Sequence, residues 1–487
     1  MLKKDDAVYT RGSIQGTMLK TGCAMLAGTL AMSGYNIADT YFVGQLGKSP
    51  LAAMGFTFPV IMLIGCLFRG LASGVMTTAA QALGSGRKSK ATRLVSSGIL
   101  LIFLVSIVLA LLGMATSEWT FEQFGATGET LELVKGYMNI WYFGCATASL
   151  SMTGNDLLIA AGDSKVASGM MIIGMFINVI FDPIFIFGFG PVPAMGIRGA
   201  ALATIGSQLV ATLVVLYVLY KRHGLLRFER IPWRQLKGSW KLVIRFAIPA
   251  SLGMLMMPIG STIITRITAA FGDTAVAATA AAGRLEMVAF IFPMALGIPL
   301  LSMVGQNYGA RLYDRIRACR RFAMRFAFLF LLGMAVIYFF AAPVLVRFFS
   351  PDQDVQQIMT LCMYIIPWGF GMIEIHRYSG FFFTGCGRPA VAAWLNALRI
   401  IGLMIPLSLL ALYLHSLVAL FAARLAADVL AGGIGYLLAR HMVNHLPADG
   451  APPQQSAVPM KPGRGLLNRL RVLATHQNEI DSQSDTQ

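Results

Sequence analysis

The chain has 487 residues, of which 56% are hydrophobic and only 13% are charged. A soluble protein carries about a quarter charged residues, because its surface must face water. The composition therefore excludes an ordinary soluble domain and indicates a protein whose surface faces lipid. The formal net charge of +17 could suggest nucleic-acid binding, but Lys and Arg gather in alternate connections between apolar segments, so we expect no nucleic-acid partner.

Apolar segments long enough to cross about 30 Å of hydrocarbon follow one another along the whole chain. A sliding hydropathy window predicts an all-α polytopic membrane protein with twelve transmembrane helices. In chain order the predicted helices cover residues 15–45, 51–79, 94–116, 131–160, 168–189, 197–220, 241–270, 276–304, 322–347, 358–384, 391–413 and 416–440.

The connections between these helices alternate in charge. Lys and Arg gather in 87–93, in 221–241 and in 311–321, whereas acids dominate 118–129 and 352–354. Because basic loops stay in the cytosol, we expect both termini there, in a multi-pass protein of the bacterial inner membrane. The first helix follows a polar start without a cleavage site, so we expect it to remain as an anchor.

The second half of the chain repeats the first at one constant offset in numbering, the one that separates Gly47 from Gly272. The repeat pairs are Gly47 with Gly272, Ala52 with Ala277, Ala53 with Ala278, Gln81 with Gln306, Gly84 with Gly309 and Gly162 with Gly387. Any one glycine is explained by close helix packing in lipid, but the shared spacing predicts two pseudo-symmetric six-helix lobes. Two such lobes can rock against each other, as in secondary transporters.

These observations divide the chain into five parts. We expect a cytosolic N-terminus (1–14), an N-terminal lobe (15–220), a cytosolic linker (221–241), a C-terminal lobe (242–440) and a cytosolic tail (441–487). The polar composition of the tail predicts disorder over most of its length. The six cysteines form no CxxC pair, so we expect no zinc site, no disulfide framework and no cofactor.

Two acids of the N-terminal lobe are candidates for ion coupling. Asn178 and Asp182 lie four residues apart, on one face of a helix. Pro183 follows, and a proline frees the carbonyl four residues before it, here that of Val179. Asp39 would add a second carboxylate, and two nearby carboxylates do not both ionise easily, so the pair is suited to carrying a proton or a Na⁺ ion. The alternative is that Asp182 merely caps or snorkels near the end of its helix.

The C-terminal lobe carries two further acids within predicted helices, Glu286 and Glu374. Glu374 is followed closely by His376 and Arg377. These acids fit either a second acidic site that recognises cations or internal salt bridges between helices. Arg424 and Asp428, four residues apart, are interpreted as a structural pair.

Several segments together resemble the multidrug and toxic compound extrusion (MATE) family. They are residues 36–47, the motifs 81–84, 162–163 and 196–200, Asn178 with Asp182, and 306–310, and the resemblance covers roughly residues 12–440. It implies twelve helices in two six-helix lobes and export of bulky, often cationic amphiphiles driven by inward flow of H⁺ or Na⁺. Independently of the resemblance, the composition predicts the lipid bilayer as a partner, and because a complete two-lobe unit could work alone, we expect a functional monomer.

Within that family the paired acids look like those of the DinF-like branch. The resemblance then implies a cation-coupling cluster of Asp39, Asn178, Asp182, Tyr137 and Asn155, with Na⁺ as a possible occupant of the first three. Proteins of that branch bend their first helix at a proline, whereas the first predicted helix of this sequence contains no proline. Other branches of the family carry an acid in the seventh helix, whereas residues 242–270 of this sequence contain no Asp or Glu.

Three interpretations of function compete. The first is a cation-coupled antiporter working by rocker-switch alternating access. The second keeps the fold and moves a lipid-linked saccharide, as a flippase, although such a cavity would be richer in Arg. The third is a membrane-embedded enzyme, which we do not expect, because there is no HExxH motif and few His lie near the spans.

Overall fold

The computed structural model describes residues 7–227 and 231–451. The N-terminal lobe contains a short 3-10 helix and six long helices: η1 (Val8–Thr10), α1 (Ile14–Gly44), α2 (Lys48–Gly84), α3 (Lys88–Gln123), α4 (Gly128–Ala160), α5 (Ser164–Phe187) and α6 (Ile197–Lys221). The tail expected to be disordered lies outside the described residues from 452 onwards.

The C-terminal lobe has the same number of passes, but two of them are interrupted. Its elements are α7 (Trp233–Ala269), α8 (Asp273–Gly309), α9 (Tyr313–Phe349), α10 (Gln353–Ile365), η2 (Ile366–Gly369), α11 (Phe370–Gly385), α12 (Pro389–Ala397), η3 (Leu398–Met404), α13 (Ile405–Tyr413) and α14 (Leu417–Asn444). One pass consists of α10, η2 and α11, and another of α12, the π-helical η3 and α13. Residues 233–241, which we expected in the linker, form the start of α7.

The predicted all-α fold with twelve transmembrane helices in two lobes is confirmed. Within the described part of the chain, ten passes are long and apolar enough to span a membrane by length and composition, and α1 and α4, with 31 and 33 residues, complete the set. Four helices have 37 residues, which is about 55 Å at 1.5 Å per residue. They are longer than the hydrocarbon is thick, so the hydropathy window placed several ends too far inside.

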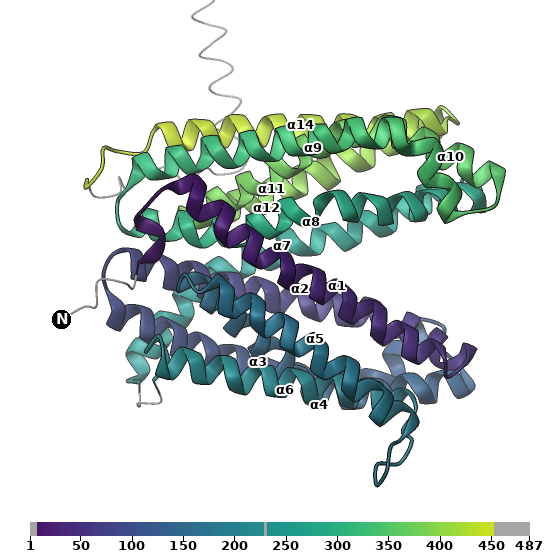
Figure 1. The fold of residues 1–487 in the computed structure, drawn as a ribbon, viewed down its shortest axis with the longest axis horizontal. Helices are drawn as coiled ribbons and strands as arrows, with labels where there is room; N and C mark the ends of the chain where they lie inside the picture. The colour runs from purple at the N-terminus through teal and green to yellow at the C-terminus, as the bar shows by residue number, and fades with distance from the viewer. Residues whose placement is uncertain (1–6, 228–230, 452–487) are drawn as a thin grey trace, which may run out of the picture. The chain divides into compact units, whose positions relative to one another are not determined.

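The first helix of each lobe packs against the second helix of the other lobe. A Cβ atom on Gly22 of α1 would lie 3.2 Å from Leu296 of α8, and one on Gly74 would lie 2.8 Å from the carbonyl of Val243. In Figure 1, α1 crosses obliquely from the helices of the C-terminal lobe to those of the N-terminal lobe. The glycines allow these close crossings, so α1 belongs to the contact surface of both lobes.

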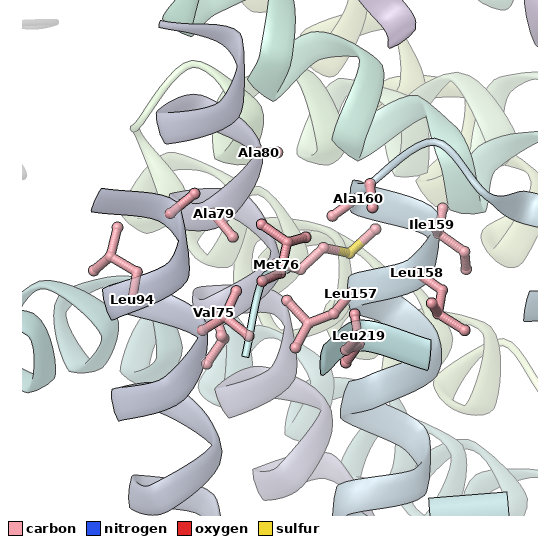
Figure 2. Packing of buried hydrophobic residues seen from close by; sticks show 14 of the residues in the cluster. Val75, Met76, Ala79, Ala80, Leu94, Leu157, Leu158, Ile159, Ala160 and Leu219 are labelled. Carbon is pink, nitrogen blue, oxygen red and sulfur yellow. The ribbon is translucent and has the colours of Figure 1, made fainter. Parts of the chain in front are cut away.

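The N-terminal lobe has its largest apolar core between α2, α3, α4 and α6. Figure 2 shows Met76 of α2 lying between its own helix and Leu157 of α4, with Leu219 nearby. This core lies where α2 and α4 end, at the end of the bundle that also holds the basic connections 85–87 and 222–227. We call this the basic end of the bundle.

In the motif 196–200, Gly199 lies where the start of α6 contacts the backbone of α5 closely. A Cβ atom on Gly199 would overlap the Phe185 carbonyl and lie 2.8 Å from the amide nitrogen of Ile186. We expect Gly199→Ala to destabilise the protein by about 1–3 kcal/mol through overpacking. Thermal unfolding in detergent measures this, with Gly206→Ala on the same helix as the control, because its Cβ would only touch the Phe181 ring at 3.4 Å. Equal melting temperatures for the two variants would contradict the prediction.

Candidate ion-coupling site

Helices α1 and α5 run side by side and bring Asp39 to Asn178 and Asp182. A Cβ atom on Gly28 would lie 2.9 Å from the sulfur of Met171, and one on Gly34 would lie 3.4 Å from that of Met175. Asp39 lies one to two turns beyond Gly34 on α1, and Asn178 and Asp182 lie one to two turns beyond Met175 on α5. Asp39 is 8% exposed and the other two side chains are fully buried. The two carboxylates are close enough for their charges to interact.

The oxygen atoms of this cluster are poorly satisfied. Asn178 donates a hydrogen bond from Nδ2 to Oδ1 of Asp182 at 3.2 Å. Among the described residues, Oδ1 of Asp39, Oδ1 of Asn178 and Oδ2 of Asp182 have no hydrogen-bond partner. No described Lys or Arg forms a salt bridge with either carboxylate. Three buried acceptors without a donor can accept a proton or coordinate a small cation.

Two tyrosines border the carboxylates. Tyr137 of α4 is buried, and Tyr35 of α1 shares a hydrogen bond of 3.1 Å with Oγ1 of Thr204 on α6. Both phenols lie close enough to Asp39 and Asp182 for electrostatic interaction. Tyr35 was not predicted to belong to the site, although its position one helical turn before Asp39 is the signal that could have found it.

Asn155 lies elsewhere on α4. It is 18 residues, or about five turns, from Tyr137 on the same helix. It is therefore close to the basic end, next to Asp156, whose charge interacts with that of Arg69 on α2. Its Oδ1 is buried and has no partner among the described residues. The structure thus brings Asp39, Asn178, Asp182 and Tyr137 together and keeps Asn155 apart from them.

The acids of the C-terminal lobe are paired with arginines. Oε2 of Glu286 accepts a hydrogen bond of 2.6 Å from Arg424. Glu374 is fully buried and lies 2.8 Å from Arg377, whose guanidinium stacks 5.2 Å from the centre of the Phe290 ring. Such pairing fits the interpretation of these two acids as salt-bridge partners. Neither oxygen of Glu374 has a hydrogen-bond partner among the described residues, so its pairing with Arg377 is one of charge, whereas no described Lys or Arg forms a salt bridge with Asp39 or Asp182.

Asp428 has a different main partner from the one we expected. Arg399 in the π-helical η3 approaches it to 2.6 Å through Nη2 and donates a hydrogen bond of 2.8 Å through Nε. Arg424, four residues before Asp428 on α14, lies 4.0 Å away. The interhelical pair with Arg399 is closer because Arg424 is directed towards Glu286.

The internal repeat shows that the fold does not require the acidic cluster. At the repeat offset, Asp39, Asn178 and Asp182 correspond to Ile264, Leu403 and Leu407. These three side chains pack against one apolar cluster in the C-terminal lobe, around Ile400 and Met404. Apolar residues at the repeat positions therefore support the same helix contacts.

The site offers too few ligands for a resident metal of the zinc type. Among the described residues there is no group of three or more His, Cys, Asp or Glu side chains that could hold a metal ion. Asp39, Asp182 and Asn178 supply only oxygen atoms, which suit H⁺ or a hard cation such as Na⁺ that binds and leaves.

Comparison with known proteins decides the family. The sequence model described as MatE matches residues 24–184 and again residues 249–410, so the second match begins at the repeat offset from the first. The chain belongs to the MATE family. MATE proteins are transporters and not enzymes, which confirms the expectation that this chain is a multidrug-efflux-type membrane transporter.

Relatives support the assignment over nearly the whole length. A protein of Shewanella oneidensis named FAD transporter is 32% identical over 449 residues, which is 92% of this chain and 99% of that protein. The multidrug export protein MepA of Staphylococcus aureus is 24% identical over 78% of this chain and 83% of its own length. A crystal structure of a mutant of the Vibrio cholerae MATE transporter VcmN superposes with a TM-score of 0.83 at 27% identity, covering 88% of this chain and 97% of that one.

Proposed function

We propose that this MATE transporter is a cation-coupled antiporter that exports bulky amphiphilic compounds. The observation that carries the proposal is the unpaired state of Asp39 and Asp182 in a lobe interior where no described base neutralises them. A buried carboxylate is expensive unless it is protonated or bound to a cation. Uptake of H⁺ or Na⁺ at this site is therefore strongly favoured, and its release can be coupled to movement of the lobes.

We further propose that the basic end faces the cytosol. The basic connections 85–87, 222–227 and 310–312 lie there, as the positive-inside rule predicts for cytosolic loops. In this orientation the carboxylates lie nearer the opposite, external face, because Asp182 is five residues from the end of α5. An inward gradient of H⁺ or Na⁺ then loads the site from outside.

The Shewanella relative favours a second, narrower candidate for the cargo, a flavin dinucleotide. That protein is named an FAD transporter, and FAD combines an apolar ring system with two negatively charged phosphates. Arg69 on α2 and Arg284 on α8 are exposed within their spans. An arginine exposed to hydrocarbon is costly, so these guanidinium groups fit a water-lined path better, where they can bind phosphate oxygens in pairs.

Export from proteoliposomes tests both parts of the proposal. We expect a fluorescent amphiphilic cation or FAD to be expelled against its gradient when a pH or a sodium gradient is imposed separately. The gradient that drives export identifies the coupling ion. Export that proceeds equally without either gradient would refute coupling, and export of the cation but not of FAD would refute the flavin cargo.

A substitution separates the two cargoes. We expect Arg69→Ala to reduce FAD export roughly tenfold to a hundredfold, the cost of a lost charge-assisted hydrogen bond, and to leave export of a cationic dye unchanged. Initial rates in proteoliposomes provide the measurement. Arg245→Ala is the control, because Arg245 is also exposed but lies near the start of α7 at the basic end. An equal loss for both cargoes would assign Arg69 a structural role instead.

A further inference from the structure

Two glutamines at the basic end cross from one lobe to the other in a symmetric way. Gln81, near the end of α2, donates a hydrogen bond from Nε2 to the carbonyl of Gly385 at 2.8 Å. Gln306, near the end of α8, donates from Nε2 to the carbonyl of Ala160 at 2.7 Å. Gln81 and Gln306 are repeat partners, and Ala160 and Gly385 are related by the same offset. Each lobe therefore holds the last turn of a helix in the other lobe by the same contact.

The glycines of the repeat make this crossing possible. A Cβ atom on Gly84 would overlap the backbone carbonyl of Gln306, and one on Gly309 would overlap that of Gln81. One turn earlier, a Cβ atom on Gly305 would lie 3.1 Å from Cβ of Ala80. The ends of α2 and α8 are thus in backbone contact, and no side chain separates them.

The chain's N-terminal segment covers the same contact. The backbone N–H of Tyr9 donates to Oε1 of Gln306 at 3.0 Å, and its carbonyl accepts from Nδ2 of Asn307 at 3.1 Å. The Tyr9 hydroxyl donates to the carbonyl of Ile159 at 2.9 Å. Tyr9 is fully buried. It binds the C-terminal lobe through its backbone and the N-terminal lobe through its side chain.

Two buried hydroxyls lie at this crossing. Thr77 and Ser302 are also repeat partners, and each lies four residues before its glutamine on α2 and α8. Both side chains are fully buried, and among the described residues neither hydroxyl has a hydrogen-bond partner. Buried hydroxyls are normally bonded. These two gain partners if water reaches them when the lobes separate at the basic end.

We propose that Gln81 and Gln306 form the lock that holds this transporter closed at its basic end, with Tyr9 as a strap across it. Breaking both glutamine contacts opens a path to the cytosol that is lined by Thr77 and Ser302. The inference rests on the proposed transport function for its purpose, but its first test does not require transport. It assigns the alternation of access to a specific pair of side chains.

Thiol labelling provides that first test. In Ser302→Cys the new thiol is buried, so we expect slow reaction with a small maleimide in detergent, over the background of the native cysteines. Adding Gln81→Ala and Gln306→Ala should accelerate labelling about tenfold, because the net contribution of two hydrogen bonds shifts an equilibrium by roughly that factor. Gln356→Ala is the matched control, because Gln356 also donates to a backbone carbonyl, that of Ser350, but at the opposite end of the bundle.

An unchanged labelling rate in folded, monodisperse double-alanine protein would overturn the lock. An equal acceleration by Gln356→Ala would also overturn it, because that result would indicate a general loosening of the protein.

If the double-alanine variant does not fold, a disulfide cross-link provides the test instead. Ala80→Cys with Gly305→Cys places two Cβ atoms close enough for a disulfide after a small shift. We expect the oxidised protein to stop transporting and the reduced protein to recover, whereas full transport by completely cross-linked protein would refute the proposal. A reduced protein that also fails to transport, while labelling behaves as expected, would count against the transport function and not against the lock.

Discussion

Replacing Asp182 with asparagine should abolish concentrative export while leaving cargo binding nearly intact. Asparagine keeps the size of the side chain and can still pair with Asn178, but it can neither take up a proton nor neutralise Na⁺. One charge moving down about 100 mV supplies about 2.3 kcal/mol, which supports roughly fortyfold accumulation. We expect D182N to lose that whole factor in proteoliposomes, and cargo affinity measured by fluorescence quenching to change only a few-fold.

The controls for this prediction use other acids of the chain. Asp39→Asn should give the same loss, because we propose that the two carboxylates form one ion-binding site. Asp273→Asn should transport normally, because Asp273 is exposed at the start of α8. Fortyfold accumulation by D182N under the same gradient would remove Asp182 from the coupling mechanism.

The second large effect concerns stability and not transport. Asp428 is 1% exposed and neutralises the buried guanidinium of Arg399. Asp428→Asn leaves that cation without its closest counter-charge, and removing one partner of a buried pair costs about 3–5 kcal/mol. We expect a clear fall in the melting temperature measured in detergent.

Two further variants show whether the loss is electrostatic. Glu118→Gln removes an exposed partner of Lys135 and should leave the melting temperature unchanged, since exposed ion pairs contribute little. The double change Arg399→Met with Asp428→Leu replaces the pair by apolar groups and should restore most of the stability. If the double variant is less stable than D428N, the site has a polar requirement beyond charge balance.

The transmembrane helices were predictable because their signal is local. Hydropathy placed all twelve passes, and the first and sixth begin within one residue of α1 and α6. The start of α9 was predicted nine residues too late, because its first nine residues are rich in arginine and extend beyond the hydrocarbon. The interruption at η2 contains Pro367, and the π-helical η3 ends directly before the helix that carries Pro406, so both interruptions lie beside prolines, whose effect on a helix a hydropathy window does not report.

The same distinction explains what could be predicted at the site. Asn178 and Asp182 were found because they share one helix face, a spacing visible in the sequence. The pairs of Glu286 with Arg424 and of Asp428 with Arg399 join different helices, so they depend on how each helix is rotated about its axis. No periodicity in a single helix records that rotation. The contact of Tyr35 with Thr204 was missed for the same reason.

The uninterrupted course of α1 has a mechanical consequence. No proline breaks its 31 residues, and its first residue, Ile14, packs with the C-terminal lobe while Asp39 lies 25 positions further on, against α5. That distance is about 37 Å at 1.5 Å per residue. A tilt of about 10° about Asp39 would therefore carry Ile14 through about 6 Å, which is more than the length of a hydrogen bond. If Asp39 takes up an ion as we propose, the length of α1 converts a small change of tilt at that carboxylate into a displacement of several ångströms at the opposite end of the helix.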